Sequence, residues 1–408
     1  MKAFIRTYGC RANQYDTEAV RQMLAAAGVE ETADASQADV AIFNSCTVTA
    51  SAEADLRADI RSAARSRPDL RTIVMGCAPG VPARDERFSP LVTLPSVDAV
   101  IAGADLEGIA AAIGISRTSR KTAQTGARAL LRIQDGCDEH CTFCATTISR
   151  GANRSRAVDE LVDEAMVLSE VHPEIVITGI HIGTYGRDTG SRLSTLVEQL
   201  ILRVPHVRFR LTSIEATEVD DKLAEMFSAD PGRLAPHLHA PLQSGSDAVL
   251  KRMGRHWYSA QSYEAAVTRI VSRVSRFALS ADVMSGFPGE TDGDHDATVS
   301  LIERLPFTSI HVFPYSPRSG TAALRLSGPV SPSIARTRAR QLRELGERKA
   351  AAYADDRIGE PCDVVVTDRG KGLTEDYLSI VVPDRFQRRD RFSGRLCSLN
   401  GNLTVLPA

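Results

Sequence analysis

Three cysteines stand close together in the run Cys137-Asp-Glu-His-Cys141-Thr-Phe-Cys144. They follow the short apolar segment RALLRIQDG, so we expect this C-x3-C-x2-C loop to begin where a strand ends. Three thiolates on so short a loop can bind three irons of a [4Fe–4S] cube and leave the fourth iron without a protein ligand. A zinc site normally takes four protein ligands, or three and a water, and would need His140 as well. The spacing therefore favours an iron–sulfur cluster with one open iron.

A second set of cysteines is spread along the first part of the chain. Cys10, Cys46 and Cys77 each come after a β-rich run, namely KAFIRTYG, DVAIFNS and RTIVMG. Up to about residue 115 such runs alternate with helical stretches, which predicts a doubly wound α/β domain with a parallel sheet. The carboxyl ends of parallel strands share one edge, so we expect these cysteines to converge there. Each one taken alone could also be an ordinary buried cysteine of the core.

The remaining chain predicts a barrel, a helix and a β module. Six or so β/α units between residues 127 and 330 indicate a partial (β/α) barrel with its active residues at the carboxyl ends of the strands. The predicted division is a first domain over 1–116, the barrel over 127–330, an amphipathic linker helix with a basic face over 331–356 and a short all-β module over 357–408. Residues 115–130 are polar and basic and are expected to form a linker.

Composition limits the possible classes of protein. The 408 residues are 43% apolar and 25% charged, which excludes a collagen-like, coiled-coil or wholly disordered chain. A net charge of −2 gives no overall electrostatic footprint for nucleic acid. No apolar run approaches the roughly 20 residues of a membrane span, and the start shows no signal peptide. We therefore expect a cytoplasmic protein without membrane contact, in which clustered thiols serve metals or catalysis rather than disulfides.

The C-x3-C-x2-C loop, with Phe143 before its last cysteine, resembles the radical S-adenosylmethionine (SAM) superfamily. The resemblance implies that SAM binds the open iron. An electron from a donor such as flavodoxin or ferredoxin then cleaves SAM to methionine and a 5′-deoxyadenosyl radical. It also implies that SAM is contacted by residues matching the family pattern, namely Phe143, Thr178, Gly179, Ser213, Glu215, Gln243 and Asp282. An ordinary ion pair at the barrel rim stays the alternative for Glu215 and Asp282.

Other segments resemble the methylthiotransferases within that superfamily. They include TYGCRANQYDTE, FNSCTVTASAEADLR, VMGC, VITGIHIGTYG and HVFPYSPRSGTAA, and they are closest to the branch that modifies N6-threonylcarbamoyladenosine in tRNA. This resemblance implies that Cys10, Cys46 and Cys77 hold a second [4Fe–4S] cluster, which carries the sulfur to be inserted. The two clusters and SAM would together place a methylthio group on C2 of the adenine next to the anticodon.

The carboxyl-terminal module resembles the TRAM domain, an RNA-binding β-barrel, through the run GLTEDYLSIVV. Two features depart from the family. Basic and acidic residues are nearly balanced in this module, and the segment ATTISRG after Cys144 replaces an aliphatic pair, a proline and an aromatic residue. Two alternatives therefore stay open: methylthiolation of a peptide or ribosomal protein side chain, and a non-catalytic iron–sulfur redox sensor that binds RNA.

Five further residues have a predicted place. Arg150, Arg154 and Arg156 lie just after the C-x3-C-x2-C loop and are expected either to contact an anionic substrate or SAM, or to lie on a solvated loop. Cys362 and Cys397 belong to neither cysteine triad. We expect them to be small buried residues of the last module.

Overall fold

The computed structural model describes residues 1–47, 50–81, 94, 96–116 and 122–407. It divides into two compact units, which we call unit 1 and unit 2. Unit 1 contains Met1–Thr122, Asp135–Arg154 and Ser316–Arg325, and unit 2 contains Ala123–Gln134, Ser155–Tyr315 and Leu326–Ala408. The C-x3-C-x2-C loop therefore belongs to the same compact unit as the first three cysteines. The domain boundaries expected from the sequence stay a prediction, and residues 117–121 of the expected linker lie outside the described residues.

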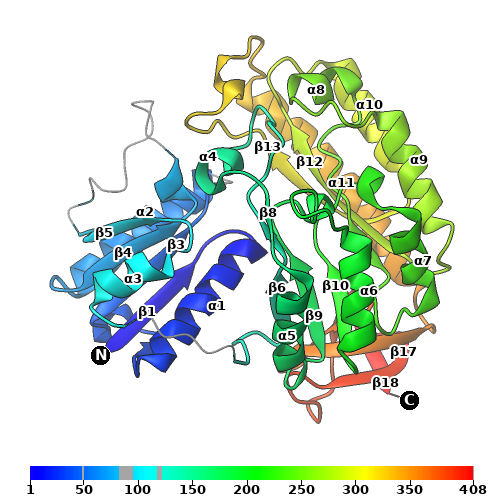
Figure 1. Cartoon of the computed structure of the whole chain (residues 1–408). Coiled ribbons are helices and arrows are strands. Elements are labelled where there is room, and N and C mark those ends of the chain that lie inside the picture. Colours follow the sequence, from blue (N-terminus) through cyan, green and yellow to red (C-terminus); the bar gives the residue numbers. More distant parts are fainter. Residues whose placement is uncertain (48–49, 82–93, 95, 117–121, 408) are drawn as a thin grey trace. The chain divides into compact units, whose positions relative to one another are not determined.

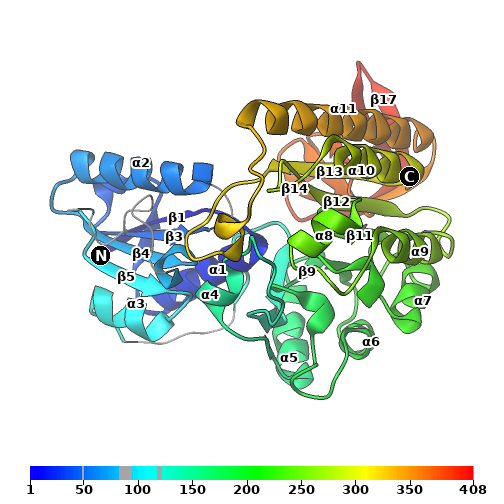
Figure 2. The same cartoon turned by 90° about the horizontal axis from the view of Figure 1, so that it is seen from above.

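Unit 1 is built on a parallel sheet with the strand order β2-β1-β3-β4-β5. Its main elements are β1 (Lys2–Thr7), α1 (Arg11–Ala26), β2 (Glu30–Thr32), β3 (Val40–Ser45), α2 (Ala50–Ser66), β4 (Arg71–Gly76), β5 (Ala99–Ala102), α3 (Leu106–Ile113) and the short α4 (Thr146–Arg150). Helices α1 and α3 pack on one face of the sheet and α2 on the other, as Figures 1 and 2 show. The predicted doubly wound α/β domain is confirmed.

Local sequence explains much of this unit. Every residue of β3 is buried, as expected for a parallel strand that is covered on both faces. Helix α3 begins after Asp105, whose carboxylate accepts hydrogen bonds from two backbone N–H groups, and it ends at Gly114 with φ +81°. Helix α1 begins at Arg11, directly after Cys10, and so includes the polar run that precedes its apolar stripe.

Unit 2 contains six parallel strands in two sheets that bridges connect. The sheets have the orders β10-β9-β6 and β11-β12-β13, and the bridges join Phe209 to Leu234 and Ser213 to His239. The strands are β6 (Ala129–Arg132), β9 (Glu174–Thr178), β10 (Arg208–Leu211), β11 (His237–His239), β12 (Ala278–Ser285) and β13 (Phe307–Pro314). Two further strands of two residues each are β7 (Gln134–Asp135) and β8 (Arg154–Ser155). The predicted partial barrel is confirmed.

Helices surround these strands on the outside (Figure 1). They are α5 (Val158–Ser169), α6 (Leu193–Arg203), α7 (Asp221–Ala229), α8 (Asp247–Arg252), α9 (Ala260–Val271), α10 (Asp292–Arg304) and α11 (Pro332–Asp356). Capping boxes start α9 at Ser259 and α10 at Thr291, and Ser331 followed by a proline starts α11. The expected linker helix over 331–356 is thus present, and it packs along β13.

The chain ends in a closed β-barrel, in agreement with the expected all-β module. Its strands are β14 (Pro361–Asp368), β15 (Lys371–Thr374), β16 (Ser379–Val381), β17 (Arg391–Leu399) and β18 (Asn402–Pro407), in the order β14-β15-β16-β18-β17. Cys362 is buried in its apolar core, as expected, whereas Cys397 is only half-buried.

This module is fastened to the amino ends of the barrel strands by buried charges. Glu174, the first residue of β9, accepts hydrogen bonds from Nε of Arg208 at 2.6 Å and from Nε of Arg210 at 2.9 Å. Arg208 also donates to the backbone oxygen of Asp363, and Arg210 to that of Thr374, each at 3.0 Å. Glu174 and both arginines are completely buried. The module therefore lies at the end of the barrel opposite the carboxyl ends of the strands.

Tyr377 completes this junction. Its backbone has φ 74°, which is uncommon for a residue with a side chain. The ring stacks on His237 of β11 with centroids 4.5 Å apart, and the guanidinium of Arg210 lies 4.9 Å from the ring centroid. The module is held by aromatic stacking as well as by ion pairs.

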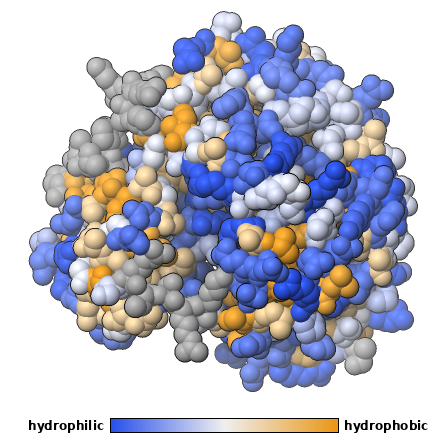
Figure 3. Space-filling view, in the orientation of Figure 1, coloured by the Kyte–Doolittle hydropathy of each residue, from blue (hydrophilic) through white to orange (hydrophobic). Residues whose placement is uncertain are grey.

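Hydrophilic residues cover most of the visible surface of unit 2, and apolar residues appear there in small groups (Figure 3). Among the residues that the structure describes, no helix is both long and apolar enough to cross a membrane.

Candidate functional site

The first three cysteines follow three neighbouring strands of unit 1. Cys46 directly follows β3, Cys77 directly follows β4, and Cys10 lies between the end of β1 and the start of α1. Because β1, β3 and β4 are adjacent and parallel, their loops leave from the same edge of the sheet. Cys10 and Cys46 lie close enough to Cys77 for their charges to affect the pKa of its thiol. We call Cys10, Cys46 and Cys77 the amino-terminal triad.

Asn13 connects the loops that carry this triad. Its side-chain Nδ2 donates hydrogen bonds to the backbone oxygens of Tyr8 at 3.0 Å and Ser45 at 2.7 Å. Its Oδ1 lies 3.5 Å from Sγ of Cys77 and 4.0 Å from Sγ of Cys10. The sequence analysis did not single out Asn13. The available signal was its position three residues after Cys10, which places the two side chains on one face of a helix.

Gly9 leaves room beside the thiol of Cys46. Its φ of +95° lies in the left-handed region, and a Cβ atom there would lie 2.5 Å from Sγ of Cys46. Any other residue would collide with the sulfur, so glycine is required by both conformation and space.

The three cysteines of the triad differ in burial, and burial changes the acidity of Cys77. Cys46 is 4% exposed and Cys77 is 8% exposed, whereas Cys10 is open to solvent. Burial raises the pKa of the Cys77 thiol to about 11, and the positive charge of Arg150 opposes this shift. Such a thiol becomes a thiolate when a metal takes the place of its proton.

The three arginines after the C-x3-C-x2-C loop differ in environment. Arg150 has a side chain only 2% exposed and pairs with Asp16 at 2.8 Å and Asp135 at 3.1 Å. Arg156 pairs with two glutamates of α5. Only Arg154, with a side chain 59% exposed, lies on the surface as the solvated-loop alternative expected.

The C-x3-C-x2-C loop holds its thiols close to backbone N–H groups. The N–H of Glu139 lies 3.4 Å from Sγ of Cys137, and the N–H of Thr146 lies 3.4 Å from Sγ of Cys144. The N–H of Cys144 donates to the backbone oxygen of Cys141 at 3.1 Å, which closes the turn between them. These three cysteines and Phe143 are half-buried. N–H groups directed at sulfur stabilise a thiolate and tune a bound cluster.

In unit 2, Thr178 and Gly179 stand where β9 ends. Thr178 is the last residue of the strand and is 2% exposed. A Cβ atom on Gly179 would lie 2.9 Å from the backbone oxygen of Gln134, so this position also requires glycine. On the neighbouring strand, Ser213 follows β10 and forms a bridge with His239.

Glu215 forms the ion pair that the sequence analysis kept as an alternative. It is 6% exposed and hydrogen-bonds Arg255, whose guanidinium lies 4.8 Å from the ring centroid of Trp257. Burial raises the pKa of Glu215, although Arg255 acts in the opposite direction. The second carboxylate oxygen, Oε2, has no hydrogen-bond partner among the described residues. A bound ligand could therefore still donate to it.

Gln243 and Asp282 are joined through the backbone. Gln243 has φ 60°, and its N–H donates to the backbone oxygen of Asp282 at 2.8 Å. Asp282 lies inside β12 rather than at its end, and its Oδ2 is 3.3 Å from Nε2 of His239. Ser280 lies 3.0 Å from the other ring nitrogen of His239. His239 of the neighbouring strand β11 thus contacts both Asp282 and Ser280 of β12.

The residues of each triad fit an iron–sulfur cluster rather than a single ion. Among the described residues, no group of three or more His, Cys, Asp or Glu side chains is placed to hold one metal ion. A [4Fe–4S] cluster needs its cysteines in a different arrangement from a single ion, because each thiolate binds a different iron. The amino-terminal triad offers three thiols at one sheet edge beside a glycine, and the loop offers three thiols, two of them near backbone donors.

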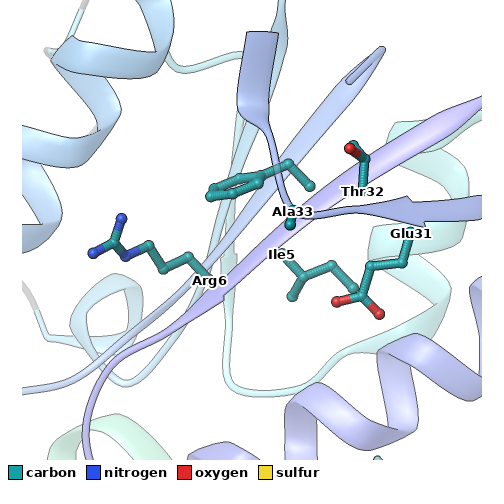
Figure 4. Close-up of a pocket in the computed structure, with 6 residues that line it drawn as sticks. Ile5, Arg6, Glu31, Thr32 and Ala33 are labelled. Atoms are coloured by element: carbon teal, nitrogen blue, oxygen red, sulfur yellow. The ribbon is translucent and has the colours of Figure 1, made fainter. Parts of the chain in front are cut away.

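A shallow pocket in unit 1 lies away from these residues. It is lined by Phe4, Ile5, Arg6, Glu31, Thr32 and Ala33, from β1 and the segment around β2 (Figure 4). None of these side chains is a thiol or a predicted SAM contact.

Two protein-family models match the chain. Residues 2–99 match "Uncharacterized protein family UPF0004", and residues 131–302 match "Radical SAM superfamily". The first match covers the amino-terminal triad, and the second covers the C-x3-C-x2-C loop and all the predicted SAM contacts.

Characterised relatives cover nearly the whole chain. A protein of Bacillus subtilis named threonylcarbamoyladenosine tRNA methylthiotransferase MtaB is 33% identical over 94% of this chain and 88% of its own length. A protein of Cereibacter sphaeroides named tRNA-2-methylthio-N(6)-dimethylallyladenosine synthase is 35% identical over 91% of this chain and 88% of its own length. Among solved structures, the radical SAM methyltransferase TsrM of Kitasatospora setae has a similar fold, with a TM-score of 0.58 and 13% identity over 77% of this chain and 74% of that one.

Proposed function

The chain belongs to the radical SAM methylthiotransferases, and we propose that it transfers a methylthio group to C2 of N6-threonylcarbamoyladenosine in tRNA, next to the anticodon. The observation that carries this proposal is the presence of two separate cysteine triads in unit 1. Methylthiolation needs one centre that generates a radical and another that supplies sulfur, and each triad offers the thiols for one centre.

The C-x3-C-x2-C loop would hold the radical-generating cluster. When that cluster and SAM are bound, they supply a 5′-deoxyadenosyl radical that removes hydrogen from the substrate. The protein contributes the three thiolates and the N–H groups of Glu139 and Thr146 beside two of the sulfurs. Glu215 contributes a buried carboxylate oxygen that can accept a hydrogen bond from SAM. A flavodoxin or ferredoxin would supply the electron.

The amino-terminal triad would hold the cluster that carries sulfur. Asn13 holds the loops of Tyr8 and Ser45 beside Cys77 through its side-chain contacts, and Gly9 leaves space for the Cys46 sulfur. This arrangement supports a preformed binding site, since the polar contacts already exist without the cluster.

Two other substrates compete with this one. The 35% identity to the Cereibacter relative favours a tRNA carrying dimethylallyladenosine as the second candidate. A peptide or ribosomal protein substrate is the third candidate, because the nearly balanced charge of the last module does not favour phosphate contacts. Both candidates keep the chemistry and change only the acceptor.

One experiment separates these acceptors. The full chain is reconstituted with iron and sulfide without oxygen, then given SAM, a reductant and one of four acceptors. These are a tRNA with threonylcarbamoyladenosine, the same tRNA without this modification, a tRNA with dimethylallyladenosine, and a candidate peptide. We expect mass spectrometry to detect the added methylthio group only on the first tRNA. Product on the dimethylallyladenosine tRNA or the peptide, and none on the first, would reject the proposed substrate.

A further inference from the structure

A buried arginine reaches the amino-terminal triad from the segment that follows the other cysteine loop. The side chain of Arg150, the last residue of α4, is only 2% exposed. Its Nε donates to Sγ of Cys77 at 3.2 Å. Its Nη2 donates to Oδ1 of Asn13 at 2.7 Å and to Oδ2 of Asp16 at 2.8 Å, and its Nη1 donates to Asp135 at 3.1 Å. The guanidinium is thus fixed in one orientation with one N–H group committed to a cysteine sulfur.

The electrostatic environment keeps this side chain charged. An arginine guanidinium stays protonated in proteins, and here the carboxylates of Asp16 and Asp135 pair with it at 2.8 Å and 3.1 Å. A buried charge is costly unless it is paired and hydrogen-bonded, and Arg150 meets both conditions. The protein therefore maintains a positive charge in direct contact with a residue expected to bind iron.

A second buried arginine lies near the same triad. Arg318, from the segment Ser316–Arg325 of unit 1, is 6% exposed and lies 3.7 Å from the carboxylate of Glu53. Burial lowers the pKa of Arg318, and the charges of Glu53 and Cys46 oppose this shift. Its Nε has no hydrogen-bond partner among the described residues. A buried donor without a partner destabilises the fold, so a sulfur acceptor beside Nε would remove this cost.

We propose that Arg150 and Arg318 are positioning residues that raise the reduction potential of the amino-terminal cluster by presenting positive charge and N–H donors to its sulfurs. This inference rests on the proposed function for the presence of that cluster. One-electron reduction adds a negative charge to a cluster, and nearby positive charge and hydrogen bonds to sulfur stabilise the reduced state. Both guanidinium groups are buried, so salt screens their effect little.

The test measures a potential rather than turnover. The midpoint potential of the amino-terminal cluster is determined by redox titration followed by electron paramagnetic resonance. The measurement uses the full chain and the Cys137→Ala, Cys141→Ala, Cys144→Ala variant, in which this cluster stands alone. We expect Arg150→Gln and Arg318→Gln each to shift the potential to more negative values, and the double variant to shift it further. Arg150→Lys keeps the charge and should give a smaller shift than Arg150→Gln.

Arg154→Gln is the matched control, because it removes the same charge from the same segment but from an exposed side chain. It should leave the potential unchanged. If the Arg150→Gln variant loses its iron, the potential of the Arg318→Gln variant decides the test, because Arg318 does not take part in the Asn13 contacts. Unchanged potentials in both glutamine variants at full iron content would overturn this proposal alone. Full iron content after Cys10→Ala, Cys46→Ala and Cys77→Ala would overturn the amino-terminal cluster itself, and this inference with it.

Discussion

Individual contacts around the amino-terminal triad show how a few polar side chains position three cysteines. Asn13 is completely buried and satisfies two backbone oxygens while its own oxygen faces cysteine sulfurs. Asp16, also completely buried, balances Arg150. Polar groups this deeply buried are tolerated because hydrogen bonds or ion pairs satisfy them. At the scale of residues, hydrogen bonds and ion pairs of buried side chains therefore hold the loops that carry these cysteines.

The two triads should each account for half of the bound iron. We expect about eight irons per reconstituted chain, because each set of three thiolates holds one [4Fe–4S] cluster. Alanine at Cys137, Cys141 and Cys144 should halve the iron and abolish SAM cleavage. Alanine at Cys10, Cys46 and Cys77 should also halve the iron. Iron analysis of the purified variants checks both statements, and an unchanged content in either variant would contradict the assignment of that triad.

Loss of the amino-terminal triad should separate radical formation from product formation. With Cys10, Cys46 and Cys77 replaced by alanine, we expect 5′-deoxyadenosine to form without any methylthiolated product, because the radical centre has no sulfur to transfer. Chromatography of both compounds in one reaction measures this. Methylthiolated product from this variant would remove the sulfur-carrying role from the triad.

Strands β9 and β10 begin with charged residues that are completely buried. Glu174 is surrounded by Arg208, Arg210 and Arg128, and burial is outweighed by these charges, so the pKa of Glu174 lies well below its ordinary value. Burial lowers the pKa of Arg210, Glu174 opposes this shift, and the charges of Arg208 and Arg128 add to it. At the scale of elements, these strands carry a charged junction at one end and the predicted SAM contacts beyond the other.

Glu174→Gln should weaken the whole of unit 2. Removing one partner from a buried ion pair leaves uncompensated charge, which typically costs about 3–5 kcal/mol. We expect a loss of this size in the free energy of unfolding, measured with denaturant. Glu264→Gln, which breaks an ion pair between two exposed helix residues, is the control and should change stability far less. Equal effects of the two changes would contradict the buried network.

The same glutamate predicts a pH dependence. Because the pKa of folded Glu174 is lowered, its contribution to stability is complete above the ordinary glutamate pKa and is lost as the pH falls below it. Stability measured from neutral pH to acid should therefore fall less steeply for Glu174→Gln than for the natural chain. Parallel curves would show that Glu174 is not the group responsible.

At the scale of the whole molecule, the charges of the last module have structural roles. Arg389 donates to the backbone oxygens of Gln124 and Gly126, and Arg391 pairs with Asp363. Arg388 also donates to a backbone oxygen. The basic run over 385–391 is thus partly used to hold unit 2 together, which leaves the exposed arginines of α11 as the better candidates for phosphate contacts.

Exposed arginines of α11 should contribute to tRNA binding. Arg336, Arg340 and Arg343 lie on one exposed face of this helix. Replacing all three by glutamine should lower the affinity for tRNA and reduce the slope of its salt dependence, because phosphate contacts release counterions. The control replaces Arg61, Arg65 and Arg203, which removes the same charge from other helices. Titrations of tRNA binding at several salt concentrations test this prediction. Equal losses of affinity in the two triple variants would reject a special role for α11.

Removing the last module should destabilise the barrel. A chain that ends after Asp356 leaves Arg208 and Arg210 at the barrel end without Asp363 and Thr374, and it exposes the face of His237 that Tyr377 covers. We expect a lower melting temperature for the truncated chain than for the full chain. An unchanged melting temperature would show that the junction contributes little, and that the module could be removed to test RNA binding directly.

Local sequence was enough to predict most elements of this protein. The helix expected over 331–356 is Pro332–Asp356, and the all-β module expected over 357–408 contains the strands β14 to β18. Both depend on periodicity and end signals, which are properties of neighbouring residues. The positions of Cys46 and Cys77 after strands followed from the same patterns. The buried polar Asn13 in the first turn of α1 contacts the cysteines, and the strand and helix patterns did not indicate this role.

The surroundings of the cysteines depended on tertiary structure. Arg150 was expected near solvent or an anionic ligand, yet its guanidinium pairs with Asp16, 134 positions earlier in the chain. The charge network around Glu174 likewise joins residues of β9, β10 and the last module. Arg318 belongs to unit 1 although it follows the barrel strands in the sequence. A charged residue carries no local sign of whether it will meet water or a buried partner. Only the folded chain brings such partners together, and burial then decides their charge and their role.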